Sequence, residues 1–346
     1  MKHFLLALVV VLVLYSLFGM ATLGSISFKL LLADDELRLV SKDILLYRLD
    51  RFLLTFSETQ NEYVQQNVED LVKSENVIVM LSTMDEIALR RLRETVEMIR
   101  TNGDYQGDIV ILTPGSDHFL YSISSALDPA NRRKVYFKVV PSLEGKVHLL
   151  PTWYSRQKPN TKSWVYLEKF FVYDLFFLNW KKVLYIDSGM RIWNHLQHVF
   201  ELSEPGILMA HSDGFPSYER KLIDACSCDE YPAQCSELTK YFRNDLSIDF
   251  FQSTFLLFEP ESVVTFETVN HLFSLVDGFN FLEGDQTYMA LYFHFIQKKW
   301  KQIPFQTKDQ RLWVYDFWTR DNRSIHDYIM FKYYHRGQMG CDSLNC

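Results

Sequence analysis

The sequence contains no long run of basic residues. Its 346 residues include 36 Lys and Arg against 43 Asp and Glu, which gives a formal net charge of −7 at neutral pH. A protein that binds nucleic acid needs clustered Lys and Arg to neutralise the phosphates. The charge pattern therefore argues against nucleic acid as the main partner.

Internal repeats and low-complexity tracts are also absent from the sequence, so we interpret residues 75–346 as one domain. Hydrophobic residues make up 48% and aromatic residues 15% of the chain, with 27 Phe and 19 Tyr. A chain of this length and composition can bury a substantial core. So many aromatic side chains also suggest stacking surfaces for rings or sugars.

Cysteine is sparse, and its spacing is not that of a usual zinc site. The five cysteines are Cys226, Cys228, Cys235, Cys341 and Cys346. The C-x-C-x6-C pattern of the first three lacks an indicated fourth ligand, which makes zinc the weaker interpretation. One or two disulfides with one thiol left over fit the pattern better, and disulfides are typical of an oxidising compartment.

An uncharged segment, residues 4–28, lies close to the amino terminus. As a helix its 25 residues would span about 37 Å, enough to cross a hydrocarbon core of roughly 30 Å. Gly19 and Ala21 offer a small-x-small cleavage pattern, so a signal peptide is the alternative to a membrane anchor. We favour an anchor over residues 1–28, because the apolar run continues through Leu23 and Ile26.

This anchor predicts a single-pass protein of the Golgi or endoplasmic reticulum membrane with a lumenal body, or a secreted protein if the segment is cleaved. Asn322, in an Asn-Arg-Ser triplet, is a weak indication of N-glycosylation in the same compartment. Between residues 30 and 73 apolar residues recur at three- and four-residue steps. That period predicts a helical stem over residues 29–74, with a coiled coil as the less favoured alternative.

The first part of the body alternates strands and helices. The pattern predicts strands at residues 76–82, 108–113 and 136–140 and helices at 86–101 and 164–177. A strand, a helix and a strand within about 40 residues form a βαβ unit. The predicted fold class is therefore α/β, with a mostly parallel mixed sheet covered by helices on both faces.

After residue 193 the pattern is less regular. A short strand at 206–210 is followed by a turn at 211–216 and by an inserted segment at 218–243 that carries three cysteines. Further elements are expected at residues 249–259 (strand), 263–277 (helix), 284–295 (helix) and 299–304 (strand).

The stretch KKVLYIDSGMRIW, residues 181–193, places a carboxylate at the end of a buried strand. Residues 183–186 are apolar and β-prone, and Asp187 follows them directly before two small residues. Ligands of open α/β sheets collect at such carboxyl ends, so Asp187 is suited to hold a cation or a ribose. The alternative is that Asp187 only caps the turn or a following helix.

Four motifs together resemble the family 8 glycosyltransferases, the group that includes glycogenin. KKVLYIDSG (181–189) resembles the strand that ends in the family's Asp-x-Asp, and FFQSTFLLFEP (250–260) resembles its FNSG strand. GDQ (284–286) and YYHRG (333–337) resemble the family's Gly-Asp-Gln and its late His-x-Gly. HSDGFP (211–216) resembles another loop of the family more weakly. Short motifs gain force from their order, and these span most of the body.

The resemblance implies an A-type glycosyltransferase fold and a defined reaction. The family transfers a sugar from a nucleoside diphosphate, usually UDP, with retention at the anomeric carbon and with Mn²⁺ or Mg²⁺ bridging the diphosphate. A divalent cation would neutralise the departing diphosphate as a Lewis acid. Carboxylate or amide oxygens would stabilise the oxocarbenium-like sugar. The implied partners are a nucleotide sugar donor and a glycan, protein or lipid acceptor.

The family's site residues can be placed on this sequence one by one. Asp187 and His335 match the metal ligands, and Asp285 and Gln286 match the residues beside the reacting carbon. The resemblance also implies nucleotide contacts at Thr83, Lys169, Asp187 and Gly337, and donor-sugar contacts at Asp213, Gln252 and Ser253.

Three departures from the family pattern bear on activity. Gly189 replaces the second metal-binding Asp, Gln252 replaces an Asn, and the Lys-Pro-Trp after His-x-Gly is missing, for which Arg336 is a substitute. With one anionic ligand missing, three outcomes are open: metal binding depends on the nucleotide, another acid supplements the site, or the metal is lost. The alternative function is a catalytically silent, membrane-tethered module that binds a glycan or a nucleotide. A nucleotidyltransferase or hydrolase on a similar sheet is a third option.

Three of these residues also have simpler structural interpretations. Taken singly, His335 is typical of a surface or packing histidine and Asp285 of a helix N-cap. Lys169 on an aromatic helix is typical of a solvated or snorkelling lysine.

Overall fold

The protein is described from a computed structural model. The residues it describes are 74–82, 86–114, 124–125, 127–152, 156, 163–213, 220–265, 267–304, 312–316 and 328–332. By their mutual contacts these residues form one compact unit. The predicted anchor and all but the last residue of the predicted stem lie outside them. No helix among the described residues is long and apolar enough to cross a membrane.

A mixed sheet forms the centre of the described part and has seven strands in the order β3-β2-β1-β4-β7-β6-β8. The first four strands are mutually parallel, β7 is antiparallel to both β4 and β6, and β8 is parallel to β6. The mostly parallel sheet is therefore confirmed. Its strands are β1 (Asn76–Leu81), β2 (Asp108–Thr113), β3 (Val135–Val139), β4 (Lys182–Ile186), β6 (Leu208–Ser212), β7 (Phe251–Phe258) and β8 (Trp300–Gln302).

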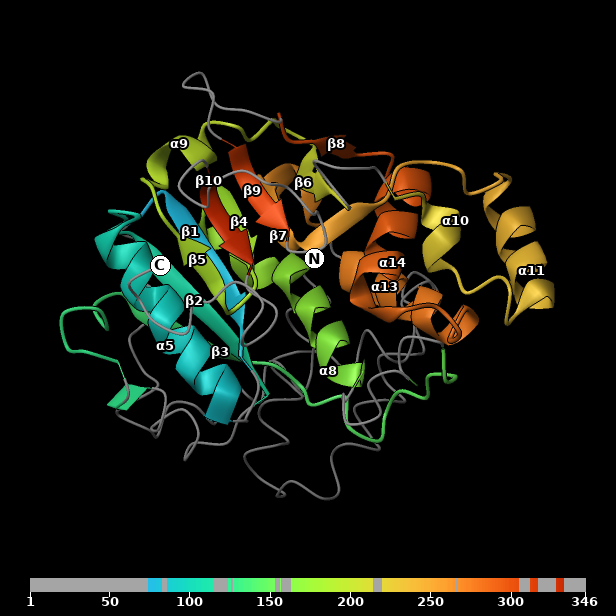
Figure 1. Cartoon of the computed structure of the whole chain (residues 1–346), viewed down its shortest axis with the longest axis horizontal. Helices are drawn as coiled ribbons and strands as arrows, with labels where there is room; N and C mark the ends of the chain where they lie inside the picture. The colour runs from blue at the N-terminus through green and yellow to red at the C-terminus, as the bar shows by residue number, and fades with distance from the viewer. Residues whose placement is uncertain are drawn as a thin grey trace, which may run out of the picture. The chain divides into compact units, whose positions relative to one another are not determined.

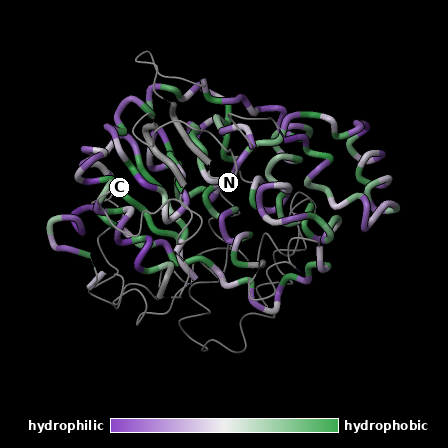
Figure 2. Tube along the Cα trace, viewed as in Figure 1, coloured by the Kyte–Doolittle hydropathy of each residue, from purple (hydrophilic) through white to green (hydrophobic). Residues whose placement is uncertain are grey.

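Helix α5 (Glu86–Thr101) covers one face of the sheet (Figure 1). Its residues Leu92, Val96 and Ile99 are fully buried, and they belong to the same hydrophobic cluster as Ile78 and Ile109. The central strands are buried on both faces, as expected for parallel strands that helices cover. Figure 2 shows the corresponding hydrophobic colouring along these strands.

The opposite face is covered by α8 (Ser163–Leu167), α13 (Thr268–Gly278), α14 (Gly284–Leu291) and two 3₁₀ helices, Glu168–Tyr173 and Leu175–Asn179. Aromatic rings make much of this layer. The ring of Tyr173 lies 5.3 Å from that of Phe258 in β7 and 5.1 Å from that of Phe293. The prediction of helices on both faces is therefore confirmed.

The single helix expected at 164–177 is wrong in its detail. The chain forms one short α-helix and two 3₁₀ helices there, separated at Asp174, whose backbone is extended (φ −70°, ψ 146°). The Asp174 carboxylate accepts a hydrogen bond from Phe176 N at 2.7 Å and so starts a new turn. All six residues of Glu168–Tyr173 are buried, which a regular amphipathic helix would not allow.

Several predicted boundaries also shift. Residues 206–210 and 211–216 were expected as a strand and a turn, but β6 continues through His211 and Ser212. The helix expected at 263–277 is two helices, and the helix from Gly284 ends in a π-helical turn. The remaining helices are α9 (Gln197–Phe200), α10 (Leu222–Ala225), α11 (Pro232–Phe242), α12 (Pro260–Val263) and the π-helix Tyr292–Ile296.

A second, three-stranded sheet was not predicted. It consists of β5 (Met190–Ile192), β10 (Tyr328–Lys332) and β9 (Leu312–Asp316), in the order β5-β10-β9. Strand β10 pairs antiparallel with β5, and Lys332 is the partner of Met190. The late part of the chain is thereby brought to the turn that follows Asp187. The alternative that Asp187 caps a following helix is wrong, because β5 follows it.

Candidate active site

The carboxyl end of β4 meets the beginning of β7 at one edge of the main sheet. Ile186 is the last paired residue of β4, and its partner in the antiparallel β7 is Phe255. One residue further, the backbone N–H of Asp187 donates to the carbonyl of Thr254 at 3.1 Å. Asp187 therefore lies beside Gln252 and Ser253, the residues expected to contact the donor sugar.

Lys169 lies at the centre of this edge and is only 3% exposed. Its Nζ is 3.1 Å from Asp187 Oδ1 and 2.8 Å from Asp285 Oδ2. The same ammonium donates to Ser253 Oγ at 3.0 Å and to the Ser253 carbonyl at 3.3 Å. A buried charge requires such partners. Lys169 is therefore not the solvated or snorkelling lysine considered as an alternative.

Asp285 and Gln286 extend from the first turn of α14 toward β7. Ser253 Oγ donates to Asp285 Oδ2 at 2.6 Å, and the backbone N–H of Ser253 donates to Gln286 Oε1 at 3.1 Å. Asp285 is 6% exposed, and the N-cap residue of α14 is Glu283. The N-cap interpretation of Asp285 is therefore wrong.

Asp213, at the end of β6, continues the polar network to the other side of Gln252. Gln252 Nε2 donates to Asp213 Oδ1 at 2.7 Å, and Thr254 Oγ1 donates to Gln252 Oε1 at 3.0 Å. Residues from five separate segments thus form one connected polar network, which we call the carboxylate cluster. Its members are Lys169, Asp187, Asp213, Gln252, Ser253, Asp285 and Gln286.

Tyr185 is a member of the site that the sequence did not single out. Its hydroxyl donates to Asp187 Oδ1 at 2.9 Å, and its ring lies under the Lys169 ammonium at 5.2 Å. Burial, with the negative charge of Asp187, raises the pKa of Tyr185 well above its usual value, so the hydroxyl stays a donor. Strand alternation could have indicated this role. Tyr185 and Asp187 are two residues apart, so their side chains point to the same face of the strand.

Arg220 was also missed. Its Nη1 is 3.4 Å from Asp213 Oδ2, and its Nη2 is 3.8 Å from Glu283 Oε2. The guanidinium also donates to the Asp224 carbonyl at 3.2 Å. Arg220 therefore joins the donor-sugar side of the site to the residue that precedes Gly284-Asp285-Gln286. Nothing in the local sequence pattern indicates this role.

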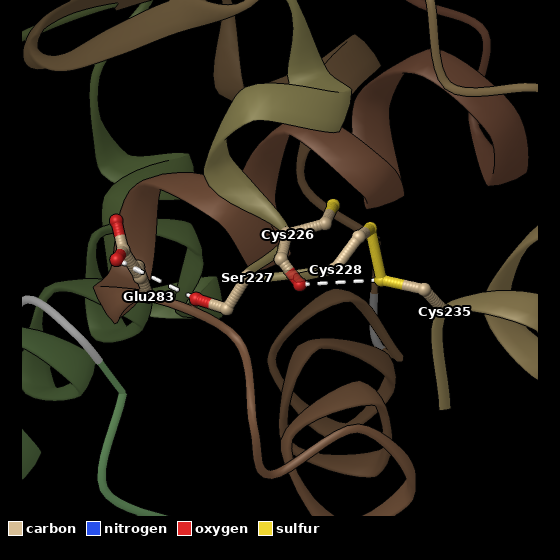
Figure 3. Close-up of a disulfide and its surroundings, with 5 residues drawn as sticks. All are labelled: Cys226, Ser227, Cys228, Cys235 and Glu283. Carbon is tan, nitrogen blue, oxygen red and sulfur yellow. Dashed lines mark hydrogen bonds between the residues drawn. A yellow bond between two sulfur atoms is a disulfide. The ribbon is translucent and has the colours of Figure 1, made fainter. Parts of the chain in front are cut away.

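The expectation of at least one disulfide among the five cysteines is confirmed, and the bond joins Cys228 to Cys235 (Figure 3). Cys226 is a buried free thiol, and burial raises its pKa to about 12. Between them, Ser227 Oγ donates to Glu283 Oε1 at 3.5 Å. This hydrogen bond joins the disulfide-bearing segment to Glu283, the residue that precedes α14. Cys341 and Cys346 lie outside the described residues.

The described residues do not fit a divalent cation. Asp187 Oδ1 already accepts the Tyr185 hydroxyl and faces the Lys169 ammonium, and Gly189 supplies no second carboxylate. In the described part of the chain, no group of three or more His, Cys, Asp or Glu side chains could hold a metal ion. Mg²⁺ and Mn²⁺ bind through several oxygen ligands. The predicted ligand His335, like Thr83 and Gly337, lies outside the described residues.

Comparison with known proteins identifies the fold. No protein-family model and no curated protein matches this sequence. Among solved structures, the galactosyltransferase LgtC in complex with donor and acceptor sugar analogues is similar, with a TM-score of 0.50 and 12% identity over 74% of this chain and 86% of LgtC. An active-site mutant of LgtC gives a TM-score of 0.51 and 11% identity, over 78% of this chain and 91% of that protein.

The bifunctional glycosyltransferase WbbM is similar to the same extent, with a TM-score of 0.50 and 13% identity over 76% of this chain. The match spans 46% of WbbM, so this chain corresponds to about half of that protein. The body therefore has the fold of these glycosyltransferases, as the resemblance of the motifs predicted.

Proposed function

We propose that this protein is an enzyme that transfers a glycosyl group from a nucleoside diphosphate sugar, with UDP as the nucleotide and with retention of configuration. The acceptor would be a glycan, a protein or a lipid. The observation that carries the proposal is Lys169, buried between Asp187 and Asp285 where β4 and β7 meet in a glycosyltransferase fold. Ligands of α/β sheets bind at such an edge.

The chain's own residues divide the work of such a reaction. Asp213 and Gln252 carry the acceptors and donors that would bind the hydroxyl groups of the donor sugar. Asp285 and Gln286 carry oxygens that would stabilise positive charge at the anomeric carbon as the glycosyl bond breaks. Ser253 holds both of them in place through its hydroxyl and its backbone N–H.

Lys169 and Tyr185 orient Asp187 for the diphosphate side of the site, Lys169 as a charge and Tyr185 as a hydroxyl donor. The Mn²⁺ or Mg²⁺ that the resemblance implies stays a prediction that depends on His335. The donor set of the described residues does not by itself fit such an ion.

Turnover of nucleotide sugars tests the proposal. The purified full chain is incubated with a panel of UDP-sugars and GDP-sugars, with and without Mn²⁺, and release of the nucleoside diphosphate is followed. We expect turnover of at least one UDP-sugar and a loss of roughly 100-fold or more in Asp285→Asn. Asp277→Asn, an exposed carboxylate in the neighbouring α13, is the matched control. The proposal fails if no donor is consumed, or if both variants behave alike.

The silent binding module remains the second candidate, since Gly189 stands where the family has a metal ligand. It predicts nucleotide binding that a chelator does not change, together with no turnover of any donor. Calorimetry on the same samples separates the two candidates. We also propose that the body is lumenal and anchored by residues 1–28, which the apolar segment and the Cys228–Cys235 disulfide support.

A further inference from the structure

Gly189 lies in a left-handed conformation (φ 101°) beside helix α5. Its backbone N–H donates to Thr95 Oγ1 at 2.9 Å, and the same hydroxyl lies 3.1 Å from the Met190 carbonyl. Further along, Arg191 forms an ion pair with Glu94 at 2.8 Å. These contacts hold α5 against the turn after Asp187. They therefore determine which side chain of α5 lies next to Gly189.

The side chain next to Gly189 is Arg91. A Cβ atom built on Gly189 would lie 3.3 Å from Arg91 Cδ and 3.8 Å from Arg91 Cβ and Cγ. At the other glycines with positive φ, Gly145, Gly206 and Gly284, the same Cβ meets nothing within 4 Å. The aliphatic part of Arg91 thus fills the space into which a side chain at position 189 would project, and its guanidinium continues from that point.

Arg91 is exposed, and no acidic side chain pairs with it among the residues that the structure describes. Lys169 differs in this respect, because two carboxylates already occupy its ammonium. A guanidinium with unused donors binds phosphate oxygens in a bidentate fashion. The Arg91 side chain therefore brings a positive charge next to residue 189. A second carboxylate at that position would instead bind a metal cation.

We infer that Arg91 binds the diphosphate of the nucleotide directly and neutralises charge on it without a divalent cation. This inference deepens the proposed function and rests on it. Gly189 stands in place of the second carboxylate, and Arg91 fills the space of that side chain. Together these two changes exchange a metal-binding carboxylate for a phosphate-binding arginine. A carboxylate at 189 attracts a metal ion that binds phosphate, whereas Arg91 binds phosphate itself.

Calorimetry with inorganic pyrophosphate and with UDP tests the inference on the purified full chain. Arg91→Met keeps an unbranched apolar side chain beside Gly189 and removes the guanidinium with its charge and donors. Arg90→Met, an exposed neighbour on α5, is its matched control. For the unmodified chain and for Arg90→Met we expect the Kd in excess EDTA to equal the Kd without EDTA. For Arg91→Met we expect Kd to rise about tenfold to a hundredfold.

Two results would overturn the inference. One is loss of pyrophosphate and UDP binding in EDTA with recovery in Mn²⁺, and the other is an equal Kd for Arg91→Met and Arg90→Met. Either would leave the proposed function standing if donor turnover is observed, so the two failures are distinguishable. If neither probe binds with or without Mn²⁺, the inference fails, and absence of turnover then removes the proposed function as well.

The double variant Arg91→Met/Gly189→Asp gives an independent readout, with a thermal melt to confirm that it folds. We expect it to bind pyrophosphate only when Mn²⁺ is added. If its binding is as insensitive to Mn²⁺ as that of Arg91→Met alone, position 189 has no relation to the cation requirement and the exchange described above is wrong. If the double variant does not fold, Arg91→Met and Arg90→Met decide the question alone.

Discussion

At the scale of single residues, the site depends on how a buried lysine is balanced by two carboxylates. Lys169 Nζ lies within 3.1 Å of both carboxylates; Lys169 and Asp285 are buried, and Asp187 is partly buried. Removing one partner of a buried ion pair lowers the free energy of unfolding, because the remaining charge stays buried without compensation. The same contacts fix the two acids relative to each other, so stability and activity are linked here.

Lys169→Met should lower the free energy of unfolding by about 3 kcal/mol or more and abolish donor turnover. The added change Asp285→Asn should restore part of the stability, because one unpaired negative charge is removed, and should restore no activity. Urea denaturation and donor turnover of the two variants measure both effects. Equal stability of Lys169→Met and the unmodified chain would contradict the buried ion pairs.

Glu168, the neighbour of Lys169, gives a prediction in pH. It is fully buried and accepts a hydrogen bond from the Leu143 N–H at 3.2 Å, and burial raises its pKa from 4.5 to about 7. Between these values the folded chain holds a proton that the unfolded chain has lost. The free energy of unfolding therefore falls as pH rises from about 4.5 to 7.

Glu168→Gln should remove this dependence and become more stable than the unmodified chain by about 1 to 3 kcal/mol at pH values above the pKa of about 7. His294 acts in the opposite direction, because burial lowers its pKa to about 4, but it is the same in both proteins and cancels in the comparison. Urea midpoints at pH 5 and pH 8 measure the difference. A constant offset between the two proteins would show that Glu168 is ionised throughout.

At the scale of elements, local sequence pattern predicted what has a regular period. Helix α5 and strand β2 were predicted with their observed bounds, and β4 within one residue, because each has an apolar run or face bounded by polar residues. The 164–177 segment was mispredicted because all six residues of Glu168–Tyr173 within it are buried, so that stretch shows no helical period. Strand β5 was missed because three residues are too few to show alternation.

Arg220 makes a testable link between elements, since it joins Asp213 after β6 to Glu283 before α14. Arg220→Gln should leave Asp213 free to turn away from Gln252, and we expect the KM for the donor to rise about fivefold to tenfold with a smaller change in kcat. Arg243→Gln, an exposed arginine at the end of α11, is the matched control. Equal loss of kcat and kcat/KM would instead indicate a role in the transition state.

At the scale of the whole molecule, the site exists because distant segments converge. Lys169, Asp213, Ser253 and Asp285 come from four different elements, and no local pattern shows that they touch. The family resemblance assigned these residues together, and the structure brings them into one network. The β5–β10 pairing is of the same long-range kind, and neither local period nor motif indicated it.

The proposed topology is tested on intact membranes. In sealed microsomes the body should be protected from added protease and become sensitive only after detergent, because residues 1–28 would anchor a lumenal domain. A chain that lacks residues 1–28 and carries an independent cleavable signal should be secreted. Digestion of the body in sealed microsomes would contradict a lumenal location, and release of the full-length body by carbonate washing would contradict an anchor.

A crystal structure of the full chain with a non-hydrolysable UDP-sugar tests the proposed site most directly. We predict that the diphosphate lies against Asp187 and Arg91, that the sugar contacts Asp213 and Gln252, and that its anomeric carbon faces Asp285 and Gln286. A nucleotide sugar bound at any other place, with the carboxylate cluster unchanged and untouched, would contradict the account.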